Sequence, residues 1–140
     1  MDGQDETFCF YDGQLVDDKM FEFLSQIREG VRCFVITDCC NSGSNLRAMR
    51  PSTPKTFDRA VPSTFKGQLI HYAGCGDGRF SYGSEEGGVF TNTLLMSYRR
   101  GISYTEWFDY AKARMPRNQK PVYTEYGNVS GVFRAQPVFT

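Results

Sequence analysis

The segment 38–43, Asp-Cys-Cys-Asn-Ser-Gly, places a carboxylate and a thiol two positions apart. The thiolate of Cys40 could act as a nucleophile, because a deprotonated cysteine is the reactive form of this side chain. The alternative is a buried structural thiol, a common fate of cysteine. Cys39 points the opposite way in extended backbone, so we expect it to pack rather than react. The chemistry of this segment therefore depends on Cys40, with Asp38 as its charged neighbour.

Two apolar runs are expected to position this segment. Residues 33–36 read Cys-Phe-Val-Ile, which is typical of a strand covered on both faces in a parallel sheet. Residues 68–73 predict a second buried strand, and a glycine-rich polar stretch, 74–83, follows it. Open α/β sheets bind ligands at the carboxyl ends of their strands, so we expect the segments after both strands to lie side by side.

Upstream of these strands, residues 7–11 predict a strand that ends in the turn pair Asp12-Gly13. A helix should follow, with Asp17 as N-cap and Gly30 in a left-handed conformation beyond its end. Its apolar face would consist of Met20, Phe23, Leu24 and Ile27. Strand, helix and the 33–36 strand then form one βαβ unit.

The second half predicts two helices and two strands. Phe90, Leu94, Leu95 and Tyr98 mark a helix that ends at Gly101. A second helix begins at Ser103, where Glu106 completes a capping box, and it stops at Pro116. Residues 122–126 and 132–135 are expected to be strands, with nearby prolines favouring sheet edges. Residues 45–67 hold three prolines without apolar periodicity, which predicts a long exposed loop.

Composition limits the classes of function. A chain of 140 residues suits one domain, 1–140, and its 40% hydrophobic content is enough for a core. Sixteen basic and 16 acidic residues leave no net charge, so neither nucleic acid nor membrane is favoured as a partner. The acidic start is unlike a signal peptide and no apolar run could span a bilayer, which predicts a cytoplasmic protein. The five cysteines lack metal-ligand spacing and are interpreted as reduced thiols.

The segment 38–43, at the end of an apolar strand, resembles the nucleophile turn of the caspase-like cysteine peptidases, in particular their metacaspase and bacterial caspase-like branch. Four further segments occur in the order found in that family: 2–6 (DGQDE), 15–18 (LVDD), 74–77 (GCGD) and 88–91 (GVFT). Together they cover nearly the whole chain. The resemblance implies a three-layer α/β caspase-like sheet with flanking helices, from which the N-terminal strands are missing.

The resemblance also implies roles for individual residues. Cys40 would attack a peptide carbonyl and form an acyl-enzyme, and its backbone N–H would supply half of the oxyanion hole. Asp38 matches the acid that binds a basic side chain in metacaspases, and the alternative is that it only caps its turn. Ser81 matches a serine of the substrate pocket, while Gly83 replaces an arginine that binds acidic residues in caspases. Both differences from caspases favour cleavage after Arg or Lys.

Calcium is a further cofactor that the resemblance implies. Asp5, Asp17 and Asp18 match three of the acids that form the calcium site of many metacaspases. Arg47 stands near the position of the last acid, where a cation would replace a ligand. The alternative for Asp17 and Asp18 is that they stabilise the N-terminus of a helix.

The family's catalytic histidine has no counterpart here, because it precedes the DGxDE segment with which this chain starts. The one histidine, His71, lies inside the 68–73 strand and is expected to be a hydrogen-bonded core residue. Three functions remain open. The chain is part of a cysteine endopeptidase that acts on peptides or proteins and is inactive alone, with a second chain or an N-terminal fragment supplying the histidine. Alternatively, it is an inactive caspase-like binding module that could form a homo-oligomer, or a small protein with redox chemistry at Cys40.

Overall fold

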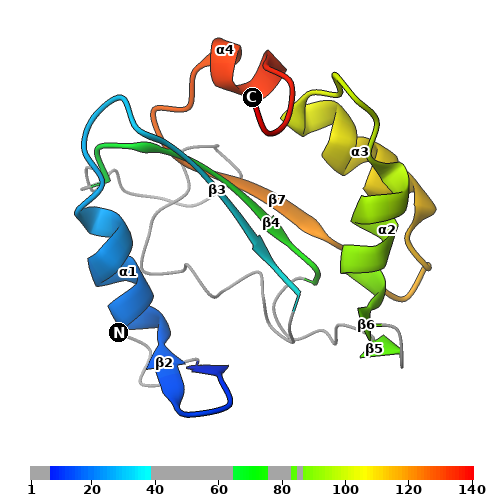
Figure 1. Ribbon diagram of the computed structural model, residues 1–140, viewed down its shortest axis with the longest axis horizontal. Coiled ribbons are helices and arrows are strands. Elements are labelled where there is room, and N and C mark those ends of the chain that lie inside the picture. Colours follow the sequence, from blue (N-terminus) through cyan, green and yellow to red (C-terminus); the bar gives the residue numbers. More distant parts are fainter. Residues whose placement is uncertain (1–6, 39–64, 76–82, 85–86) are drawn as a thin grey trace, which may run out of the picture.

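The computed structural model describes residues 7–38, 65–75, 83–84 and 87–140. Its centre is a mixed three-stranded sheet with the order β3-β4-β7 (Figure 1). The strands are β3 (Arg32–Thr37), β4 (Gln68–Ala73) and β7 (Val122–Gly127). β3 and β4 run parallel with Thr37 opposite Ala73, whereas β7 is antiparallel to β4. The described residues thus form a small α/β domain, as the sequence predicts.

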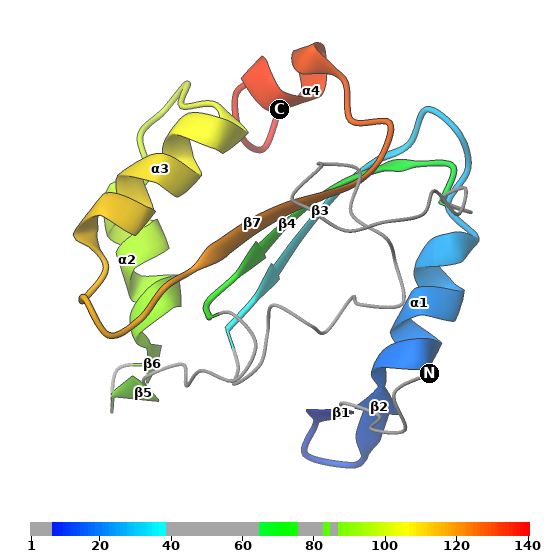
Figure 2. The same ribbon diagram turned by 180° about the vertical axis from the view of Figure 1, so that it is seen from behind.

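Helices cover both faces of this sheet, as the two opposite views show (Figures 1 and 2). One face packs against α2 (Val89–Ser97), α3 (Tyr104–Arg114) and α4 (Gly131–Ala135), and the other against α1 (Asp17–Ser25). Alternate residues of β4 divide between the two cores, since Leu69 packs with Leu24 of α1, while Ile70 and Tyr72 pack with the other helices.

β4 is the central strand and is buried from Leu69 to Ala73, so the prediction of a buried strand is confirmed. The same prediction for β3 is wrong, because β3 is only partly buried and Ile36 is 39% exposed. Among the described residues β3 is an edge strand, with β4 on one side and no strand on the other. An edge position explains why an apolar run does not become a fully covered strand.

The N-terminal βαβ unit is a second wrong prediction. β1 (Thr7–Cys9) pairs antiparallel with β2 (Gln14–Val16) in a hairpin and does not join the three-stranded sheet. The expected turn is present, since the Phe10 N–H donates to the Gly13 carbonyl at 2.8 Å. A hairpin with a tight turn satisfies the backbone of residues 7–9 locally, so no distant partner strand is needed.

α1 begins where the sequence predicts but differs in detail. Its N-cap residue is Val16 rather than Asp17, and no side chain caps it. Leu24 is buried, whereas Phe23, which was expected on the apolar face, is 66% exposed. Gly30 has the expected positive φ of 83°, four residues beyond the C-cap Gln26. The helix is therefore one turn shorter than its apolar pattern suggests.

α2 and α3 agree best with the sequence. The capping box of α3 is complete: the Glu106 N–H donates to Ser103 Oγ, and the Ser103 N–H donates to the Glu106 carboxylate. Trp107 Nε1 donates to the Leu94 carbonyl at 2.8 Å and joins the two helices. Leu95, expected on the apolar face of α2, instead points to solvent.

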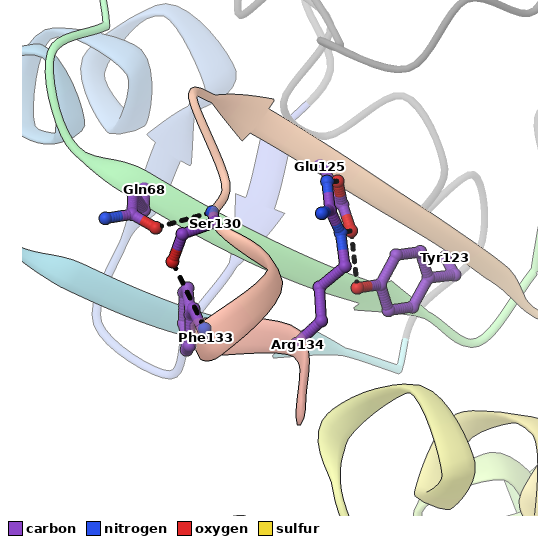
Figure 3. A network of polar contacts seen from close by, with 6 residues as sticks. All are labelled: Gln68, Tyr123, Glu125, Ser130, Phe133 and Arg134. Atoms are coloured by element: carbon purple, nitrogen blue, oxygen red, sulfur yellow. Dashed lines mark hydrogen bonds and ion pairs between the residues drawn. The ribbon is translucent and has the colours of Figure 1, made fainter. Parts of the chain in front are cut away.

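The predicted strand 132–135 is wrong, because these residues belong to α4. Ser130 caps α4 by accepting from the Phe133 N–H, and its own N–H donates to Gln68 Oε1 at 2.8 Å (Figure 3). Arg134 holds α4 to β7 through two 2.7 Å hydrogen bonds to the Glu125 carboxylate. A serine cap and a paired arginine outweigh the β-propensity of so short an apolar run.

The predicted exposed loop, 45–67, falls largely outside the described residues. Its described end differs from the prediction, since Phe65 is 5% exposed and packs against Leu69 and Tyr126. Gly67 is also buried. Among the described residues, no helix is long and apolar enough to cross a bilayer.

Candidate functional site

The carboxyl ends of β3 and β4 meet, as the sequence predicts. The Gly74 N–H donates to the Thr37 carbonyl at 2.8 Å, so the residue after β4 is still bonded to the last residue of β3. Asp38 therefore leaves the sheet beside Gly74, and the helix α2 begins at the same place. This junction of two strand ends and one helix N-terminus is the candidate functional site.

Asp38 joins β3 to α2. Its carboxylate oxygen Oδ2 accepts from the Thr91 N–H at 3.0 Å and from the Thr91 hydroxyl at 2.8 Å. α2 needs this acceptor, since its own N-cap residue is Gly88, which has no side chain. A carboxylate at this position satisfies a free backbone N–H and interacts favourably with the positive end of the helix dipole. Asp38 thus caps a helix that is distant in the sequence. The sequence-based alternative was that Asp38 caps only its own turn, and it did not include this contact.

Two glycines make room for this carboxylate. A Cβ at Gly88 would lie 1.9 Å from Asp38 Oδ2, and a Cβ at Gly74 would lie 2.7 Å from Oδ1. Gly88 has φ −68° and ψ 135°, a conformation open to any residue. The absence of a side chain at 88 is therefore required by the carboxylate and not by the backbone.

His71 is buried beneath the same strand ends. Its side chain is fully buried, and Nε2 lies 2.8 Å from Thr37 Oγ1 across the β3–β4 pair. The expectation of a hydrogen-bonded core histidine is confirmed. Burial lowers the pKa of His71 from 6.5 to about 4, so the ring is neutral at physiological pH. Nδ1 has no hydrogen-bond partner within the described part of the chain.

Gln119, in the loop between α3 and β7, reaches the junction from the other side. It is 2% exposed, and its Nε2 donates to the Gly74 carbonyl at 2.9 Å. Gln119 was not predicted as a site residue, and no local pattern in the sequence would have identified it. Thr91 and the two glycines occur in segments 74–77 and 88–91, but their contact with Asp38 was not foreseen.

Several predicted site residues lie outside the described residues: Cys40, Ser81 and Asp5. The same holds for Arg47 and Cys39. The backbones of Asp17 and Asp18 form the first turn of α1, where an acid stabilises a helix, while their side chains are not described. No group of three or more His, Cys, Asp or Glu side chains that could hold a metal occurs in the described ranges.

Comparison with known proteins adds evidence on the fold. The chain matches no protein-family model and no curated protein. It is similar to the crystal structure of protein GSU0716 from Geobacter sulfurreducens, with a TM-score of 0.77 and 28% sequence identity. The match covers 99% of this chain but 63% of that chain, so this chain spans less than two thirds of the length of its neighbour. This similarity supports the α/β fold of the chain. The name of the neighbour states no activity.

Proposed function

We propose that the chain is the nucleophile-bearing part of a caspase-like cysteine endopeptidase that cleaves after Arg or Lys in the cytoplasm. Cys40 is the nucleophile: its thiolate attacks the peptide carbonyl, the amine product leaves with a proton, and water then hydrolyses the acyl-enzyme. Cys33 is a free cysteine, which fits a reducing compartment.

The observation that carries this proposal is the place of Asp38. The nucleophile stands two residues after Asp38, which follows a strand of a parallel pair whose carboxyl ends form the candidate site. The Thr91 contacts fix the Asp38 carboxylate, and the lack of side chains at Gly74 and Gly88 lets it lie against the backbone. A fixed carboxylate beside a nucleophile is suited to select a positively charged substrate side chain.

This proposal includes a general base from outside the chain. His71 is the single histidine, and its burial and lowered pKa make it unsuited to exchange protons with a substrate. An N-terminal segment or a second chain would supply the histidine, and calcium at Asp5, Asp17 and Asp18 would be a regulator. The edge strand β3 offers a place for the added chain, because Val31 and Ile36 are partly exposed along it.

The partly exposed edge at β3 also supports a second candidate function, an inactive caspase-like binding module. Phe139 is 69% exposed beside Tyr98 and Phe34, with ring centroids 6.0 and 6.4 Å away. An exposed apolar group near a strand edge is typical of an assembly surface. In this case the chain would bind a partner or a second copy without cleaving a peptide.

Labelling with acyloxymethyl-ketone probes separates these functions. The probe with Arg at P1 is compared with the probe with Asp, on wild type and Cys40→Ala, with and without calcium. We expect slow labelling by the Arg probe that is lost in Cys40→Ala. Equal labelling of Cys40→Ala, or equal labelling of the folded wild type by the two probes, would contradict the peptidase and favour the binding module.

A further inference from the structure

An open pocket of about 710 Å³ lies beside the loop that joins α3 to β7. Three cations line it, Lys112, Arg117 and Lys120, and none of the described residues that line it is acidic. Apolar side chains, including Met115 and Pro121, complete the wall. The chain as a whole has no net charge, so this concentration of positive charge is local.

The three cations are not equally engaged. Lys112 belongs to the last turn of α3, where its charge offsets the negative end of the helix dipole, and its Nζ lies 5.9 Å from the centre of the Phe108 ring. Arg117 and Lys120 follow the helix and form no ion pair with any residue in the described part of the chain. Both side chains are exposed at the pocket. These two residues are therefore the ones suited to bind an anionic group.

The pocket adjoins the candidate site through Gln119. Gln119 lines the pocket, and its buried carboxamide donates to the Gly74 carbonyl at 2.9 Å. The Cβ position of the same glycine lies 2.7 Å from Asp38 Oδ1. Gly74 therefore separates an acidic side chain from a basic pocket. An extended ligand across the carboxyl ends of these strands would meet a negative charge on one side of Gly74 and positive charges on the other.

We propose that the pocket at the α3–β7 loop binds an acidic side chain of the same peptide whose basic side chain is held by Asp38. The substrate class is then a peptide with Arg or Lys at the cleavage position and Asp or Glu a few residues away. This inference rests on the proposed function and adds a second position of recognition to it. Charges of opposite sign at two positions also fix the direction in which a peptide lies.

Peptide binding to the Cys40→Ala protein, which lacks the proposed nucleophile, tests this inference. A series of peptides contains one Arg and one Glu, and the Glu is placed at each position before and after the Arg in turn. Each peptide is compared with the peptide that has Gln in place of Glu. Binding is followed by nuclear magnetic resonance shifts of the ¹⁵N-labelled protein, including the Gln119 carboxamide. At one position we expect Glu to bind about three- to tenfold more tightly than Gln, as suits two exposed ion pairs.

Two double variants serve as matched tests. Arg117→Gln with Lys120→Gln should abolish the preference for Glu and leave the affinity for the Gln peptide unchanged. Arg28→Gln with Arg100→Gln removes two exposed charges elsewhere and should leave the preference intact. Equal losses in both double variants, the absence of any Glu preference, or no binding of any peptide would overturn the inference.

One further peptide separates this inference from the proposed function. Replacement of the peptide Arg by norleucine removes the group that Asp38 is proposed to bind. If the replacement leaves affinity unchanged, Asp38 does not select basic residues and the proposed specificity fails. The Glu preference and its loss in the pocket variant would still report on the pocket alone.

Discussion

The close contact between Asp38 and Gly88 makes the two residues energetically dependent on each other. Gly88→Ala should displace the carboxylate from Thr91, because the new Cβ would lie 1.9 Å from Oδ2. We expect a loss of about 1–2 kcal/mol in the free energy of unfolding, the usual cost of losing a helix cap. In an Asp38→Ala background the same change should cost little. Urea unfolding of the two single variants and the double variant measures this coupling, and additive losses would contradict the contact.

His71 should make the protein sensitive to acid. Its folded pKa of about 4 is below the unfolded value of 6.5, so the unfolded state binds the proton more readily. Its contribution to stability is complete above pH 6.5 and is lost as the pH falls towards 4. We expect a loss of about 2 kcal/mol between pH 7 and pH 4.5 from this residue. The urea midpoint should fall less steeply with decreasing pH for His71→Leu than for wild type. Identical pH dependence of the two midpoints would show that the pKa of His71 is not lowered in the folded state.

At the scale of elements, Glu125 and Arg134 hold α4 on the sheet. Glu125 is 2% exposed, and it accepts from Arg134 and from the Tyr123 hydroxyl (Figure 3). Burial alone would raise the pKa of Glu125, but these hydrogen bonds outweigh burial and lower it below 4.5. The carboxylate therefore contributes stability above pH 4.5 and loses it as the pH falls through the folded pKa.

Removal of the cation should be more damaging than removal of both charges. Arg134→Leu takes away the guanidinium beside a buried carboxylate, and we expect a loss of about 2 kcal/mol, since Arg134 itself is partly exposed. Adding Glu125→Gln neutralises the carboxylate and keeps an acceptor for the Tyr123 hydroxyl. Thermal unfolding at pH 7 should show that the double variant is more stable than Arg134→Leu. The reverse order would mean that the pair does not hold α4.

Helices whose end signals and apolar face lie within one short segment were predictable from the sequence. α3 has its capping box and its apolar face within twelve residues, 103–114, and the structure agrees. α4 was mistaken for a strand because five residues are too few to show a helical period, although Ser130 is a good cap. A strand was predicted at 7–11 and is observed at 7–9, but its partner was not predicted, because pairing depends on which segment lies nearby.

In the candidate site, too, features set by the local sequence were predicted and contacts between distant segments were not. The place of Asp38 at a strand end follows from the apolar run before it and from the general geometry of α/β sheets. Its contact with Thr91 spans 53 positions, and the contact of Gln119 with Gly74 spans 45. Such contacts depend on how elements pack, which no short pattern encodes.

At the scale of the whole molecule, the described domain has a sheet whose edge at β3 is partly exposed and a longer neighbour of similar fold. Both features fit a peptidase whose histidine comes from additional chain. The proposed roles of two residues concern this chain alone: Cys40 is proposed as the nucleophile, and Asp38 is proposed to select the residue that Cys40 attacks.

Both proposed roles can be tested by the rate at which Cys40 reacts with the Arg and Asp probes, in wild type and in Asp38→Asn. Asparagine keeps an oxygen that can accept from Thr91, so the variant removes the charge with little change to the helix cap. Intact mass spectrometry follows each reaction. We expect the Arg probe to react faster than the Asp probe in wild type and the two rates to converge in Asp38→Asn. An unchanged rate ratio in Asp38→Asn, or adducts on another cysteine, would contradict the account.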